Sequence, residues 1–206
     1  MSIELLFEQI ETLLQSDRSR SIIGIVGKPG AGKSTVVEEI QSRFDSSEVC
    51  IIPMDGYHLS NEELIKLGRR DRKGAPDTFA VSEFIDFLKR VKTHSSIEHR
   101  FPIFHREIEA SVAGEGVVPT SSRVIVTEGN YLFSEEYNWG ELFQILDHSW
   151  FIDIDEEVRL ERLIARHIRY GKTPEEAKAW SLGSDESNAR FIELTAHRAE
   201  NIIKVR

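Results

Sequence analysis

Apolar residues in this chain follow two kinds of pattern. Short, mostly apolar runs occupy 22–26, 49–53, 124–130 and 150–154. Such runs predict buried strands, because a strand covered on both faces carries apolar residues at successive positions. Between them, apolar residues recur at intervals of three or four, which predicts helices that pack one face against a sheet. Strands that alternate with helices are typical of α/β folds, so we expect a parallel central sheet with helices on both faces.

The predicted helices begin before the first strand. Ile3–Leu14 places its apolar residues on one face, which indicates an N-terminal amphipathic helix that packs on the domain. In the last third, Thr173 followed by Pro174 supplies an N-cap and a proline at the first helical position. Further helices are predicted over 36–44, 61–67, 81–91 and 158–168, and from about 184.

Four segments have weaker patterns. Gly68–Pro76 is polar and basic and is predicted to be a loop, the kind of segment that often carries binding residues. Phe101–Phe104 is predicted to be a short extended piece at a sheet edge, because Pro102 lacks a backbone N–H. His105–Ser122 is either a hairpin or an excursion from the core, and Asn201–Val205 is a candidate for a final edge strand.

The segment between the first strand and the following helix has the pattern G-x-x-x-x-G-K-[ST]. In such a P-loop, glycines let backbone N–H groups turn toward phosphates, and the helix presents its positive end. Lys33 can reach the outer phosphates, and the Ser34 hydroxyl can bind magnesium. The sequence therefore predicts a site for a nucleoside triphosphate and Mg²⁺, made of Gly27, Lys28, Pro29, Gly30, Ala31, Gly32, Lys33, Ser34 and Thr35.

Composition narrows the class of protein further. The net charge of -9 argues against a nucleic-acid binder and against adhesion to an anionic membrane. The single cysteine, Cys50, allows no intramolecular disulfide, and no group of histidines and cysteines has metal-ligand spacing. No segment resembles a signal peptide or a membrane span, so we expect a cytoplasmic protein.

Phosphate binding alone is shared by several classes. A GTPase would carry N-K-x-D to bind guanine, and this tetrapeptide is absent, while the D-x-x-G match at Asp71–Gly74 follows a basic loop instead of a strand. Motor ATPases are usually larger. The remaining classes are a small-molecule kinase, which we favour, and a non-catalytic nucleotide-binding regulator as the alternative.

Two acidic residues end predicted strands, where open α/β sheets bind their ligands. Asp55 is a candidate to orient the hydroxyl of a phosphoryl acceptor and to accept its proton. Glu128 is a candidate to hold magnesium or a water bound to it. The alternatives are an Asx-turn or helix cap at Asp55 and a solvated strand-end acid at Glu128.

Arginines near the end of the 158–168 helix are candidates for a mobile lid. Arg159, Arg162, Arg166 and Arg169 interleave with the apolar stripe and are predicted to point away from it. Arg166 and Arg169 precede Gly171, where a hinge could bring them to the phosphates, although a solvated helix face would carry the same pattern. We therefore predict one domain over 1–206, with an N-terminal helix in 1–18 and a lid at about 165–180.

Several motifs together resemble those of a known group. Besides the P-loop they are Met54–His58, Arg72–Pro76, Glu128–Tyr131 and Arg166–His167. The chain resembles P-loop small-molecule kinases related to uridine kinase, phosphoribulokinase and bacterial pantothenate kinase, from about Ser21 onward. The resemblance implies a three-layer α/β/α fold, roles in ATP and Mg²⁺ binding for Lys33 and Ser34, Asp55 as acid-base residue, Glu128 as metal support and Arg166 in the lid. Members of the group often form homodimers.

The acceptor side departs from the pattern of the group. His105 stands where members tend to carry an aspartate before the arginine of an F-x-R segment, and Ala80 replaces another frequent aspartate. The basic loop that includes Arg72 and Lys73 would favour an acidic acceptor, whereas a solvated loop is the alternative. Nucleoside-, pantothenate- and sugar-like acceptors all remain open. The residues expected around the acceptor are Asp55, Tyr57, His58, Arg72, Lys73, His105, Arg106, Glu128, Asn130 and Tyr131.

Overall fold

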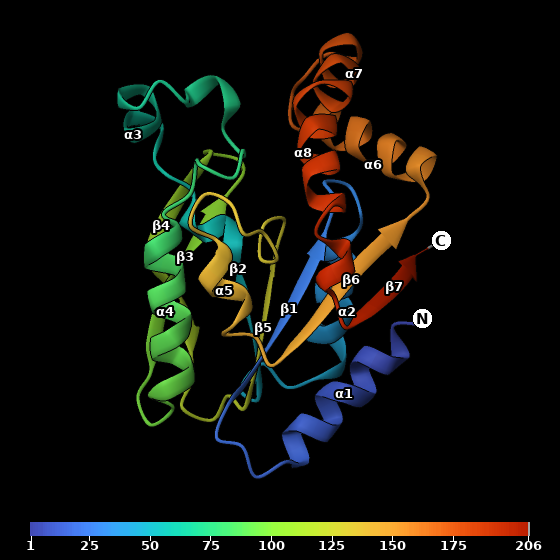
Figure 1. Ribbon diagram of the computed structural model, residues 1–206. Coiled ribbons are helices and arrows are strands. Elements are labelled where there is room, and N and C mark those ends of the chain that lie inside the picture. Colours follow the sequence, from blue (N-terminus) through green and yellow to red (C-terminus); the bar gives the residue numbers. More distant parts are fainter. Residues whose placement is uncertain (206) are drawn as a thin grey trace.

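A parallel sheet of five strands forms the centre of the protein, which a computed structural model describes for residues 1–205 (Figure 1). Its strands are β1 (Ser21–Gly27), β2 (Val49–Pro53), β5 (Val124–Gly129), β6 (His148–Ile154) and β7 (Asn201–Val205). They lie in the order β2-β5-β1-β6-β7, and every neighbouring pair is parallel. Every residue of β1 is buried, as an unbroken apolar run requires. The predicted α/β fold is confirmed, and β7 forms one sheet edge.

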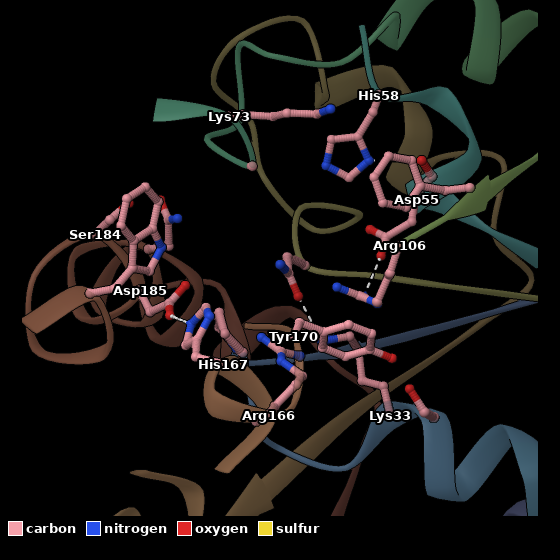
Figure 2. Close-up of a pocket in the computed structure, with 18 of the residues that line it drawn as sticks. Lys33, Asp55, His58, Lys73, Arg106, Arg166, His167, Tyr170, Ser184 and Asp185 are labelled. Carbon is pink, nitrogen blue, oxygen red and sulfur yellow. Dashed lines mark hydrogen bonds and ion pairs between the residues drawn. The ribbon is translucent and has the colours of Figure 1, made fainter. Parts of the chain in front are cut away.

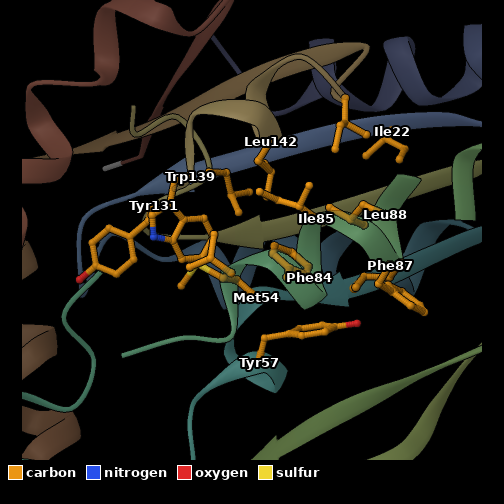
Figure 3. Packing of buried hydrophobic residues seen from close by; sticks show 14 of the residues in the cluster. Ile22, Met54, Tyr57, Phe84, Ile85, Phe87, Leu88, Tyr131, Trp139 and Leu142 are labelled. Atoms are coloured by element: carbon orange, nitrogen blue, oxygen red, sulfur yellow. The ribbon is translucent and has the colours of Figure 1, made fainter. Parts of the chain in front are cut away.

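Helices cover both faces of the sheet because each strand sends apolar side chains to alternate sides. One face packs against α1 (Glu4–Gln15) and α2 (Lys33–Arg43), through residues that include Leu6, Ile10 and Ile40. The other face packs against α4 (Val81–Thr93) and α5 (Gly140–Phe143), in the core that Figure 3 shows around Phe84 and Trp139. No helix within residues 1–205 is long and apolar enough to cross a membrane.

A second, separate sheet is a hairpin of β3 (His99–His105) and β4 (Ala110–Val118). It resolves the two alternatives for 105–122 in favour of a hairpin. The hairpin packs against a 3-10 turn, η1 (Met54–Tyr57), that directly follows β2. Gly56 makes this approach possible, because a Cβ atom at this position would lie 2.0 Å from the carbonyl oxygen of Pro102.

The remaining helices flank the upper ends of the strands in Figure 1. On one side lies α3 (Asn61–Lys66), which leads into the basic segment with its short turn η2 (Arg70–Arg72). On the other side lie α6 (Glu156–Arg169), α7 (Pro174–Leu182) and α8 (Ser184–Glu193). Helix α7 begins as predicted, with Thr173 in a capping box and Pro174 at its start.

The prediction for Arg159 is wrong. Its side chain has no exposed surface, and it lies with Leu163 on the buried face of α6, whereas the apolar Ile168 is 42% exposed. The reason is the surface that α6 covers. This helix packs against the polar backbone of the P-loop, where a guanidinium can satisfy carbonyl and carboxylate oxygens that an apolar residue would leave without a donor.

Candidate active site

A cavity of about 670 Å³ opens beyond the carboxyl ends of β1, β2 and β5 (Figure 2). One part, the P-loop side, is lined by residues of 29–35 together with α6, α7 and α8. The other part, the hairpin side, is lined by residues of 55–58, 70–79 and 104–109. Glu128 and Asn130, at the end of β5, also line the cavity and lie where its two sides meet.

The P-loop adopts a backbone that only glycine accommodates easily. Gly30 and Gly32 have φ angles of 84° and 93°, in the left-handed region. At Gly30 a Cβ atom would also lie 2.7 Å from the carbonyl oxygen of Arg159. Helix α2 begins at Lys33, so its free N–H groups face the cavity, as an anion site at a helix start requires. Of the predicted loop, Pro29, Gly30, Gly32, Lys33, Ser34 and Thr35 line the cavity.

The other loop residues have different positions. The Lys28 ammonium pairs with Glu156 and Glu193, at 3.3 and 2.9 Å. Ala31 is fully buried in the core, and the carbonyl oxygen of Gly27 accepts a hydrogen bond from Lys33. None of these three lines the cavity, because their side chains or backbone groups are engaged behind the loop.

Lys33 reaches across the ends of two strands. Its Nζ atom donates to the carbonyl oxygen of Gly27 at 2.8 Å and to Oδ1 of Asn130 at 2.6 Å. Burial lowers the pKa of this ammonium to about 8, although the charges of Glu128 and Asp55 act in the opposite direction. An anionic ligand in the cavity would add negative charge beside this buried ammonium.

Strand register brings the two predicted acids together. Pro53 at the end of β2 is paired with Glu128 in β5, and Asp55 follows two residues later in η1. Nη2 of Arg106 donates to Oδ2 of Asp55 at 2.9 Å. Because the β3–β4 hairpin packs on Gly56, Arg106 at its turn is held over this carboxylate.

The two carboxyl groups have opposite pKa shifts. Burial favours protonation of Asp55, but His58, Arg106 and the cations beyond them outweigh it and hold its pKa below the usual value. Burial and the nearby charge of Asp55 raise the pKa of Glu128 to about 7. Near neutral pH, Asp55 is therefore ionised, and Glu128 can exchange a proton easily.

Aromatic rings form a wall on the hairpin side. The ring of His58 packs between Phe79 and Phe104, with centroids 4.1 and 4.7 Å away. Its Nδ1 atom lies 2.8 Å from the carbonyl oxygen of Asp55, which fixes the ring beside the carboxylate. Lys73 also lines this side, and it comes from the basic segment that was predicted to be a loop of the kind that carries binding residues.

Four residues predicted to contact the acceptor do not line the cavity. Tyr57 packs on Phe84 in the core, and Tyr131 is 1% exposed and donates its hydroxyl to the carbonyl oxygen of Gly74. Arg72 forms two hydrogen bonds with Asp77, at 2.6 and 2.7 Å, and His105 pairs with Glu115 at 2.6 Å along the hairpin. Each of these four side chains contacts another residue of the protein instead of the cavity. The sequence pattern did not reveal these contacts.

The α6–α8 region contributes more residues than the sequence predicted. Arg166 lines the cavity, whereas Arg169 is exposed outside it and Arg162, one turn before Arg166, takes its place. The i, i+4 spacing of 162 and 166 is the signal that could have identified this pair. His167 pairs with Asp185 at 2.6 Å (Figure 2). The cavity-lining residues from α7 and α8, which include Trp180, Ser184, Asp185 and Asn188, carried no motif.

Arg159 supports the P-loop from behind. Its Nη1 atom donates to the carbonyl oxygen of Pro29 at 3.1 Å, and its Nε and Nη2 atoms bond Glu156 and Glu186. This fully buried guanidinium therefore ties the loop to both α6 and α8. Nothing in the sequence indicated this support beyond an arginine in a predicted helix.

Comparison with known sequences agrees with this geometry. The profile of the phosphoribulokinase / uridine kinase family matches residues 22–206. The chain belongs to this family. Membership identifies the protein as a P-loop small-molecule kinase, and it implies the use of ATP, typically with Mg²⁺.

The names of related proteins refer to different phosphoryl acceptors. A candidate uridine kinase of Schizosaccharomyces pombe is 31% identical, over 87% of this chain and 81% of its own. A pantothenate kinase of Streptococcus equi subsp. zooepidemicus is 29% identical, over 88% and 67%. The crystal structure of a candidate fructose transport system kinase from Silicibacter sp. TM1040 is 30% identical, covers 98% of both chains and has a TM-score of 0.88. Similarity to these proteins supports kinase chemistry and leaves the acceptor open.

Proposed function

We propose that this protein transfers the γ-phosphoryl group of ATP to a hydroxyl of a small metabolite, with Mg²⁺ as the metal. The observation that carries the proposal is the shared cavity of Lys33, Asp55 and Glu128, three groups from separate strand ends. A phosphoryl-transfer site needs a cation for the transferring oxygens, an acid that orients the acceptor and a further acid near the metal. The acceptor class among nucleoside-, pantothenate- and sugar-like hydroxyl compounds belongs to this proposal, not to the family assignment.

In the proposed reaction, the acceptor oxygen forms a bond to the γ-phosphorus, and the bond from that phosphorus to the β–γ bridging oxygen breaks. The electron pair of the broken bond leaves with ADP. Asp55 orients the acceptor hydroxyl and takes its proton late in the transfer, which its low pKa allows. Lys33 and Arg166 stabilise the negative charge that spreads over the transferring oxygens.

The residues present fit a magnesium ion. Ser34 and Glu128 line the cavity and offer hydroxyl and carboxylate oxygens, the donors that Mg²⁺ prefers. Within residues 1–205 no cluster of three or more His, Cys, Asp or Glu could hold a metal. That finding is compatible with Mg²⁺, which usually keeps most of its ligands as waters and phosphate oxygens. When bound, the ion would neutralise charge on the outer phosphates.

The direct test measures ADP release with panels of nucleosides, pantothenate, sugars and sugar phosphates, for the wild type and Asp55→Asn. Loss of acid-base assistance should lower acceptor-dependent turnover at least ~100-fold and leave the Kd for ATP nearly unchanged. Asp71→Asn, an acid in the exposed basic loop, is the matched control. A nucleotide-binding regulator would instead show no acceptor dependence and no sensitivity to Asp55→Asn.

A further inference from the structure

The cations on the hairpin side differ in what they pair with. Arg106 pairs with Asp55 at 2.9 Å, and Arg70 pairs with Glu109 at 3.2 Å. Lys73 lines the same part of the cavity, yet no carboxylate within residues 1–205 lies within 4.0 Å of its ammonium. The chain as a whole carries a net charge of -9. Of the three cations on the hairpin side, Lys73 is therefore the one without an ion-pair partner in the described residues.

The ammonium of Lys73 is held in place by neutral groups. Nζ donates to Oδ1 of Asn61 at 2.9 Å and to the backbone carbonyl oxygen of Glu109 at 2.7 Å. It also lies 5.3 Å from the ring centroid of Phe104. An ammonium has three donors, so one remains for a ligand. Burial lowers the pKa of Lys73 and the charge of Arg70 adds to this effect, although the more distant charges of Glu109 and Glu62 act in the opposite direction.

The position of Lys73 relative to Asp55 adds a second constraint. In Figure 2 the ring of His58 lies between these two side chains, and Phe104 packs against that ring. A small molecule that packs on these rings would have the carboxylate of Asp55 at one end and the ammonium of Lys73 at the other.

From this arrangement we infer that the acceptor carries a carboxylate or phosphate group besides its reactive hydroxyl, and that Lys73 binds this anion. The inference rests on the proposed kinase function and specifies its acceptor class. It also separates two residues that the sequence grouped together. Arg72 already has its carboxylate in Asp77, so the preference for an anion comes from Lys73 and not from the basic loop as a whole.

Matched pairs of acceptors test this inference. They are pantothenate with pantothenol, glycerate with glycerol, and fructose 6-phosphate with fructose, each assayed for ATP-dependent ADP release. A charge-assisted hydrogen bond predicts kcat/KM about 10–100-fold higher for the anionic member of the productive pair. Lys73→Met should remove this preference through KM, and Lys73→Arg should retain most of it. Lys66→Met, an exposed lysine at the end of α3, should leave the ratio unchanged.

Binding provides a readout that does not depend on turnover. The P-loop side is first saturated with Mg²⁺ and a non-hydrolysable ATP analogue, and each of the three anionic compounds is then titrated by calorimetry. At least one of them should bind the wild type with a Kd about 10-fold or more below its Kd for Lys73→Met. Equal binding to both proteins, or a neutral acceptor used as well as its anionic partner, would overturn the inference. The latter result would leave the kinase proposal intact, whereas loss of all ATP binding would count against that proposal instead.

Discussion

The P-loop side of the cavity is built from nearly consecutive residues, whereas the hairpin side takes its side chains from separate segments. Residues 29–35 surround the expected phosphate position with backbone N–H groups and one lysine, supported from behind by the buried Arg159. On the hairpin side, Asp55, Lys73 and Arg106 come from a turn after β2, a basic loop and a hairpin turn. The first construction suits a ligand common to a whole family, and the second allows the acceptor to vary.

The comparison predicts that substitutions on the P-loop side act independently of the acceptor. The largest effect is expected for Lys33→Met, which removes a cation from the transferring phosphoryl group. Turnover should fall on the order of 10²–10³-fold with every acceptor that the wild type uses. Lys28→Met is the comparison variant, because this lysine of the same loop pairs with Glu156 and Glu193 outside the cavity. A Lys33→Met defect that depends on the acceptor would contradict the division into two sides.

The second prediction concerns the support behind the P-loop. Arg159→Met removes the donor to the Pro29 carbonyl oxygen and leaves Glu186, which is 27% exposed, without this partner. Breaking a buried pair costs about 3–5 kcal/mol, and the partial exposure of the acids reduces our estimate for this one to about 2–3 kcal/mol of unfolding free energy. Urea denaturation measures this value. Arg169→Met, on the exposed face of the same helix, should change it by less than about 0.5 kcal/mol.

Nucleotide titration extends the Arg159 experiment. If the guanidinium holds the loop in its binding conformation, the Kd for ATP should rise in Arg159→Met under conditions in which the variant is fully folded. Unchanged stability together with unchanged ATP affinity would show that the P-loop keeps its conformation without support from α6.

The smallest predicted effect is a pH dependence at the junction of the two sides. The folded protein raises the pKa of Glu128 from 4.5 to about 7, so between these values the folded state binds more protons than the unfolded state. Stability from this group is therefore present at low pH and is lost as pH rises through that window. Glu128→Gln should gain on the order of 1 kcal/mol relative to wild type between pH 5 and pH 8.

Thermal melting without nucleotide measures the effect of Glu128→Gln across this pH range. Glu161→Gln, which removes an exposed carboxylate of α6, controls for the change in net charge. A difference between Glu128→Gln and wild type that stays constant from pH 5 to pH 8 would mean that Glu128 does not titrate near neutrality.

Most of the framework could be predicted from the sequence. The P-loop residues that line the cavity are nearly consecutive, and the buried strands are mostly apolar runs, so local patterns were sufficient to define both. Asp55 and Glu128 were found because a parallel sheet gathers the carboxyl ends of its strands at one edge. Arg106 and His58 were predicted from the resemblance to a family. The close packing of the hairpin on Gly56 explains why these two residues lie beside Asp55 in the fold.

The partners of charged side chains were decided only by the tertiary structure. Arg72 and Lys73 are adjacent cations in the sequence, but Asp77 neutralises the first and neutral oxygens hold the second. In the same way, Arg159 has the appearance of a solvated helical arginine and yet is buried behind the P-loop. Sequence patterns report the burial of apolar side chains, which depends on periodicity. They do not report which charged groups meet, because that depends on how loops and helices are placed against one another in three dimensions.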